Sequence, residues 1–253
     1  IRVKTANAGA SGVSGELSFI SGTTSGGASG AIRLTTGAAT NGAGGSITML
    51  VGLSQTDTGG HIVSNAGVSV PLTGGAVSLS AGAGTATSSG SLVVRTVNSG
   101  VAGTSGYLLF ATGTTSDGSS GAMRFSTGAA TGGKGGDIKM SVGAGTASTG
   151  GLFLVNAGIS SAKTGGAISM TTGAGTATSS GAIVIKTPDA GTSGVSGSIS
   201  FSTGTTSSGS SGKIRFVTGA ATNGKAGRML FSVGTGTSGN GGDINVVAGQ
   251  TTD

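Results

Sequence analysis

The hydrophobic pattern of the chain repeats in stretches of fifteen residues. The clearest repeat, KIRFVTGAATNGKAG at 213–227, has apolar residues at its second and fourth positions and Gly at its seventh and fifteenth. Ile214 and Phe216 alternate with their neighbours Arg215 and Val217, and this two-residue period is typical of a half-buried β-strand. The remainder, rich in Gly, Ala, Thr and Asn, is typical of turns. Each repeat therefore predicts one clear strand and, within the turn-rich remainder, a second and weaker extended piece such as Ala174–Thr178.

The fifteen-residue repeats are grouped into a longer repeat of 91 residues. Two repeats, Ser91–Gly106 and Ala182–Gly197, carry a sixteenth residue and begin 91 residues apart. The chain is thus interpreted as one continuous array, 1–253, built of six-repeat blocks at 1–90, 91–181 and 182–253. It starts and stops inside repeats, so we expect an excerpt of a longer chain. The extra residue is predicted to lie in the turn segment, because an insertion in a strand would reverse the faces of all later residues.

The pattern predicts an all-β fold, a β-solenoid of stacked fifteen-residue repeats. One strand pair with two large apolar residues cannot fold alone, whereas stacked copies bury these residues and pair the backbone. One repeat per coil is favoured, and two or three per coil remain open. The predicted interior comes from the second and fourth positions: Ile32, Leu34, Met123, Phe125, Phe201, Ile214, Phe216 and Phe231.

Composition excludes several classes of protein. The chain has 56 Gly and only 8% charged residues, and its large apolar residues recur regularly, which argues against disorder. Collagen is excluded because Gly is not found at every third residue. There is no Cys, and no apolar run is long enough to span a membrane. The formal charge of +6 is dispersed over thirteen basic residues, with one Tyr and no Trp, so nucleic acid is not an expected partner.

Motifs for phosphate or metal binding are incomplete. The sequence of Gly219–Ala226 nearly matches the phosphate-binding loop motif G-x-x-x-x-G-K-[ST]. However, Ala226 occupies the position of the Ser or Thr whose hydroxyl would bind Mg²⁺. GGKGGD at 132–137 resembles the start of a calcium-binding nonapeptide, yet Lys139 replaces its large apolar residue. Calcium sites need several oxygen ligands, and the acidic residues are too sparse, so Asp137 and Asp243 are interpreted as exposed residues that begin strands.

No arrangement of residues suggests catalysis. His61 is the only histidine, and the seven acidic residues stand far apart in the sequence. A Ser or Thr nucleophile needs a positioned base, which only His61 could supply. We therefore predict that the protein is not an enzyme and has no cofactor or metal.

Two resemblances remain. Thr85-Ala86-Thr87 and Thr176-Ala177-Thr178 resemble the T-x-T motif of insect antifreeze proteins, although neighbouring repeats lack it. The whole chain resembles, as a class, the Gly/Ser/Thr-rich β-solenoid proteins of surfaces and fibres. That resemblance implies an extracellular or cell-surface filament, stalk or adhesin shaft, formed by self-association and with O-glycans as possible cover. The alternative is a surface-binding module for ice or carbohydrate.

Overall fold

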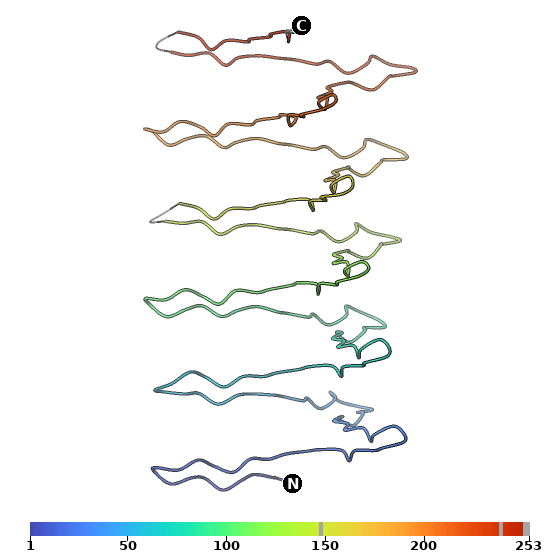
Figure 1. Ribbon diagram of the computed structural model, residues 1–253, viewed down its shortest axis with the longest axis vertical. Coiled ribbons are helices and arrows are strands. Elements are labelled where there is room, and N and C mark those ends of the chain that lie inside the picture. Colours follow the sequence, from blue (N-terminus) through green and yellow to red (C-terminus); the bar gives the residue numbers. More distant parts are fainter. Residues whose placement is uncertain (147–148, 238–239, 250–253) are drawn as a thin grey trace. The chain divides into compact units, whose positions relative to one another are not determined.

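The computed structural model describes residues 1–146, 149–237 and 240–249, and within these ranges the chain contains neither helix nor β-strand. The predicted all-β solenoid is therefore wrong for this chain. The described residues form extended segments joined by bends (Figure 1). Alternation of apolar and polar residues is present, but a strand also requires a ladder of backbone hydrogen bonds to a neighbour. Gly, which is abundant here, disfavours strand because its unfolded backbone has more freedom to lose.

The bends occur at the same place in successive repeats. They cover the tenth to twelfth positions, as at 25–27, 40–42, 55–57 and 207–209. In the sixteen-residue repeats the bend moves one position onward, to 101–103 and 192–193. The fifteen-residue spacing thus determines where the backbone turns.

Each bend folds its repeat so that the closing Gly lies against the residue at the sixth position. A methyl group built on Gly45 would lie 3.3 Å from Thr36 Cβ, and one built on Gly136 would lie 3.2 Å from Thr127 Cβ. Where the sixth residue is Val the approach is closer, and a methyl on Gly60 would lie 2.7 Å from Val51 Cγ1. In these repeats the closing position leaves little or no room for a side chain, whereas at Gly90 and Gly121 a methyl would make only ordinary contact, at 3.6 Å.

The same folding produces some of the backbone hydrogen bonds of the chain. The N–H of Gly75 donates to the carbonyl oxygen of Gly67 at 2.8 Å, and Gly166 repeats this bond to Gly158 at 2.9 Å, 91 residues later. Such bonds join the closing Gly of a repeat to its seventh-position Gly. They are isolated contacts within one repeat, which is why no ladder results.

The sixteenth residue of the long repeats lies between the sixth position and the bend, within the predicted turn segment. Thr96 lies near Gly106 and Thr187 near Gly197, so the facing residues are ten positions apart rather than the usual nine. The Thr187 hydroxyl also donates to the carbonyl oxygen of Gly197 at 3.1 Å. The segment between the sixth position and the bend is therefore one residue longer in these repeats.

Side chains at the ninth position stabilise several bends. Ser54 Oγ accepts from the N–H of Asp57 at 3.1 Å, and Ser160 Oγ accepts from the N–H of Lys163 at 3.0 Å. This is the local hydrogen bonding by which Ser favours turns. Gly118 adopts a φ of 118°, a left-handed conformation that Gly tolerates and other residues rarely adopt.

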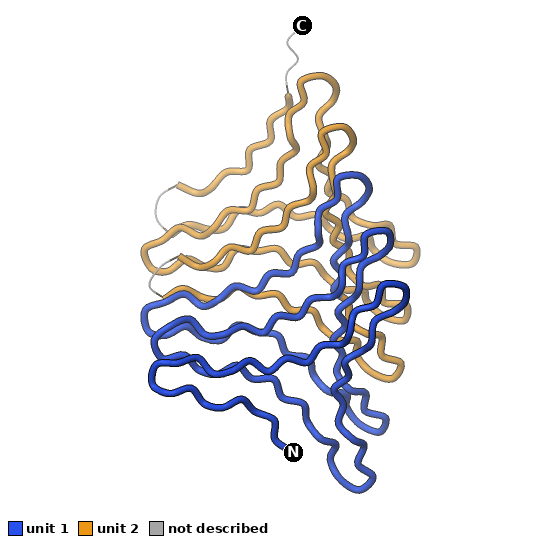
Figure 2. The backbone as a smooth tube through the Cα atoms, turned by 60° about the horizontal axis from the view of Figure 1, so that its bottom comes forward, with its two compact units in different colours: residues 1–125 blue, residues 126–253 orange. Residues whose placement is uncertain are grey.

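The chain divides into two units, Ile1–Phe125 and Ser126–Asp253 (Figure 2). Unit 1 runs back and forth, its extended segments reversing at the bends, and unit 2 is built from the same repeats. The boundary falls inside the repeat 122–136, after its fourth position. Within the described ranges, no helix is long and apolar enough to cross a membrane.

Candidate assembly surface

The apolar residues predicted to form an interior are exposed in the single chain. Their exposed fractions lie between 46% for Met123 and 72% for Leu34. No side chain in the described residues is buried. Within the described ranges, one copy therefore leaves these apolar residues uncovered. Their assignment to an interior stays a prediction. The set comprises Ile32, Leu34, Met123, Phe125, Phe201, Ile214, Phe216 and Phe231.

The second and fourth positions nevertheless differ from the third. Ile183 and Ile185 are 55% and 56% exposed, whereas Val184 between them is 76% exposed. In the triplet Leu108, Leu109 and Phe110, the third-position Leu109 is likewise the most exposed of the three. The two-residue period read from the sequence therefore gives each segment one more sheltered apolar side and one open side.

Fourth-position residues of successive repeats meet in unit 2. The rings of Phe201 and Phe216 pack edge to face, with centroids 6.3 Å apart and an interplanar angle of 81°. Such geometry places the electropositive edge of one ring against the electronegative face of the other. Equivalent positions of neighbouring repeats can therefore lie side by side even though no ladder joins their backbones.

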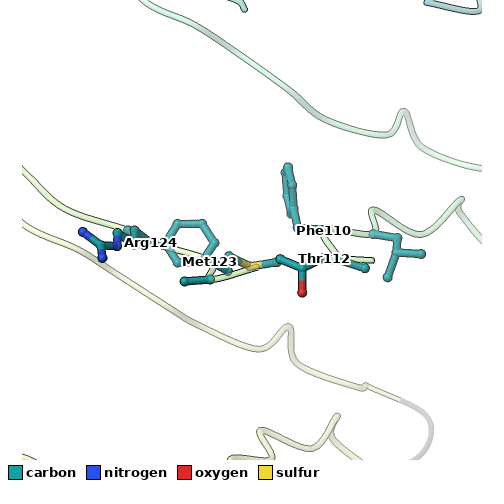
Figure 3. A pocket seen from close by; sticks show the side chains of 8 residues that line it. Phe110, Thr112, Met123 and Arg124 are labelled. Carbon is teal, nitrogen blue, oxygen red and sulfur yellow. The ribbon is translucent and has the colours of Figure 1, made fainter. Parts of the chain in front are cut away.

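Shallow apolar hollows lie between such segments. One, of about 480 Å³, is lined by residues 109–112 and 122–125 of unit 1. Figure 3 shows that the Arg124 side chain extends away from Phe110 and Met123, so the charge lies at the margin. A second hollow, of about 470 Å³, lies in unit 2 between residues 215–217 and 229–231. Both expose rings and methyl groups, which suit apolar side chains, beside one arginine each, Arg124 and Arg215.

The acidic residues and the histidine considered for metal binding do not form a cluster, and Asp137 instead lies close to two lysine side chains. Asp137 accepts from Lys134 Nζ at 2.7 Å, and Lys139 Nζ lies 3.9 Å from its second carboxylate oxygen. The carboxylate in the calcium-like stretch is thus neutralised by lysines. In the described part of the chain, no three His, Asp or Glu residues gather where they could hold a metal. His61 is exposed.

The remaining motifs lie in bends. Thr85–Thr87 and Thr176–Thr178 occupy bends, so these T-x-T stretches do not form the flat strand face that such a motif uses for ice. Residues 222–224 of the phosphate-loop-like stretch also form a bend, and no helix follows it in the described residues.

Sequence reasoning missed the contact between the closing Gly and the sixth residue. The signal was available, since small or β-branched residues occupy the sixth position and Gly closes each repeat, nine or ten residues later. No protein-family model matches the chain, and neither a curated protein nor a solved structure is similar to it.

Proposed function

We propose that this chain is a structural protein that associates with copies of itself to form an extracellular filament, stalk or adhesin shaft. The observation that carries the proposal is the exposure of regularly spaced apolar side chains at the second and fourth positions, none of which the described part of the chain buries. Repetition supplies length, and each repeat presents the same small apolar surface. Recognition of other partners is assigned to parts of the assembly other than these repeats.

The exposed area of the single chain supports association. It is 25034 Å², whereas a folded monomer of this mass exposes about 9,700 Å² and an unfolded chain about 34,000 Å². Large exposed apolar patches mark surfaces that bind other molecules. A second copy supplies what one copy lacks, because its apolar side chains have the same size and the same fifteen-residue spacing.

The polar surface is compatible with close packing of copies. Only 8% of the residues are charged, so little repulsion opposes association. Hydroxyl groups of Ser and Thr are abundant and can hydrogen-bond between copies or carry O-linked sugars. The sequence contains no N-x-[ST] acceptor, so N-linked glycans do not shield the surface.

Assembly of the purified chain tests the proposal. A first variant changes to Ser three fourth-position residues, Phe201, Phe216 and Phe231. A matched control changes to Ser three third-position residues that are 73–76% exposed, Val63, Val93 and Val184. Electron microscopy and sedimentation velocity would measure filament formation and the critical concentration for it.

We expect the unmodified chain to form filaments and the first variant to raise the critical concentration by about tenfold or more, since tenfold corresponds to only 1.4 kcal/mol. The control variant should assemble nearly as the unmodified chain does. A chain that stays monomeric at every concentration, with the spectroscopic signature of a disordered polymer, would overturn the proposal. Equal effects of both variants would show that the fourth-position rings are not the contact.

A further inference from the structure

Two Asn-Gly pairs occupy bends of the chain at the same place in their repeats. Asn41-Gly42 lies in the bend 40–42, and Asn223-Gly224 lies in the bend 222–224. The Asn is the eleventh and the Gly the twelfth residue of the repeat in both cases. The pairs are separated by two 91-residue periods, and all four residues are exposed.

The space around these pairs is open. A methyl group built on Gly42 or on Gly224 would meet nothing within 4 Å. Water and the preceding Asn side chain can therefore approach the backbone nitrogen of each Gly. The absence of a Cβ on the following residue also removes the main steric obstacle to closing a five-membered ring on the backbone.

A third Asn-Gly pair, Asn240-Gly241, does not lie in a described bend, and the asparagines that precede alanine are less favourably placed. Asn65 precedes Ala66 and Asn156 precedes Ala157, and each of these alanines is half-buried. Both also lie in the extended segment before the bend. The Asn-Gly bends therefore combine three favourable conditions that the Asn-Ala sites lack: no β-carbon on the following residue, an exposed backbone and a curved local conformation.

We propose that Asn41 and Asn223 are sites of spontaneous, self-catalysed deamidation. The deprotonated backbone nitrogen of Gly42 attacks the side-chain amide carbon of Asn41, a C–N bond forms, and ammonia leaves with the original amide nitrogen. The product is a succinimide. Water then adds to either of its two carbonyl carbons, and the bond between that carbon and the ring nitrogen breaks. One opening yields aspartate and the other yields isoaspartate; water is the only co-reactant and nothing is oxidised or reduced. Asn223 and Gly224 react in the same way.

The product changes the bends in two ways. Each conversion replaces a neutral amide with a carboxylate and lowers the formal net charge of +6 by one. The isoaspartyl form also routes the main chain through the side chain, which lengthens the backbone inside the bend. The reaction thus gives the protein an age-dependent mark at defined repeats, and this inference does not depend on self-association.

The middle block provides an internal control. Its equivalent of Asn41 is Gly132, followed by Gly133, so the bend 131–133 has the same position but no amide to react. A methyl group built on Gly132 would meet nothing within 4 Å, so an Asn side chain fits there. Gly132→Asn would reproduce the Thr-Asn-Gly-Lys sequence of the third block.

Peptide mass spectrometry of the full chain, incubated at mildly alkaline pH and neutral pH, tests the proposal. We expect aspartate and isoaspartate to accumulate in the peptides that contain Asn41 and Asn223, faster at the alkaline pH. Asn41→Gln should abolish the product at that site alone. Gly132→Asn should create a new reactive site at position 132, and Gly224→Ala should slow the reaction at Asn223.

The proposal would be overturned if Asn65 and Asn156 were converted as fast as Asn41 and Asn223. It would also be overturned if Asn41 and Asn223 stayed unmodified in the chain while a short peptide of the same sequence reacted, because the bends would then protect rather than promote the reaction.

Discussion

Phe201 and Phe216 meet edge to face across one repeat length, with ring centroids 6.3 Å apart. Fifteen residues separate them, so each is the fourth residue of its repeat. The contact shows that the fifteen-residue spacing can bring equivalent apolar side chains of successive repeats together. It also indicates which side chains are available to a second copy, because both rings remain more than half exposed.

The ring contact is expected to be measurable in a double-mutant cycle. Phe201→Ala and Phe216→Ala, alone and combined, should give a coupling free energy of about 0.5–1.5 kcal/mol, the usual range for an aromatic pair. Urea denaturation of the assembled chain would provide the free energies. The control pairs Phe201→Ala with Val184→Ala, which lies in another repeat and should show no coupling. Coupling of equal size in both cycles would contradict a specific ring contact.

Gly60→Ala is expected to destabilise the chain by about 1–3 kcal/mol, the usual cost of overpacking. The new methyl would lie 2.7 Å from Val51 Cγ1, and the β-branched Val has few rotamers with which to yield. Gly59→Ala is the matched control, since nothing lies within 4 Å of a methyl there. Combining Gly60→Ala with Val51→Ala should restore most of the loss. The measurement is again the free energy of unfolding, and equal effects at both glycines would refute the contact.

Removing the bend hydrogen bond of Ser160 should cost about 0.5–1.5 kcal/mol. In Ser160→Ala the N–H of Lys163 loses its side-chain acceptor, whereas Ser161→Ala removes a neighbouring hydroxyl without this bond. Hydrogen exchange of the Lys163 amide would report the change directly, and it should accelerate in the first variant only. Unchanged protection would show that the hydroxyl does not stabilise the bend.

The lysine pair around Asp137 should contribute little to stability. Lys134 and Asp137 have side chains 81% and 47% exposed, and exposed ion pairs typically stabilise a protein by less than about 1 kcal/mol. Asp137→Asn should therefore lower the free energy of unfolding only slightly, and the difference should vanish in high salt because screening weakens such pairs. Asp243→Asn serves as the control. A large, salt-independent loss would indicate that Asp137 has another role.

Much of the local structure could be predicted from the sequence, because it depends on residues close together in the chain. The fifteen-residue period located the bends, since Gly, Ser and Asn at the ninth to twelfth positions favour reversal wherever they occur. The extra residue of 91–106 and 182–197 was assigned to the turn segment, and it lies there, between the sixth position and the bend. The one-sided placement of Ile183 and Ile185 relative to Val184 follows from alternation alone.

Strand pairing and burial were decided only in three dimensions. A ladder needs backbone groups of two segments in register, and alternation within one segment cannot show whether a partner lies within hydrogen-bonding distance. The contact of Gly60 with Val51 likewise depends on how tightly the bend closes. Burial of Phe216 also depends on contacts between segments, and within the described residues Phe216 remains 59% exposed. The sequence by itself determined where the chain bends and which side of each segment is apolar, because these are short-range properties; only the tertiary structure decided that the segments meet through isolated glycine and aromatic contacts instead of a sheet.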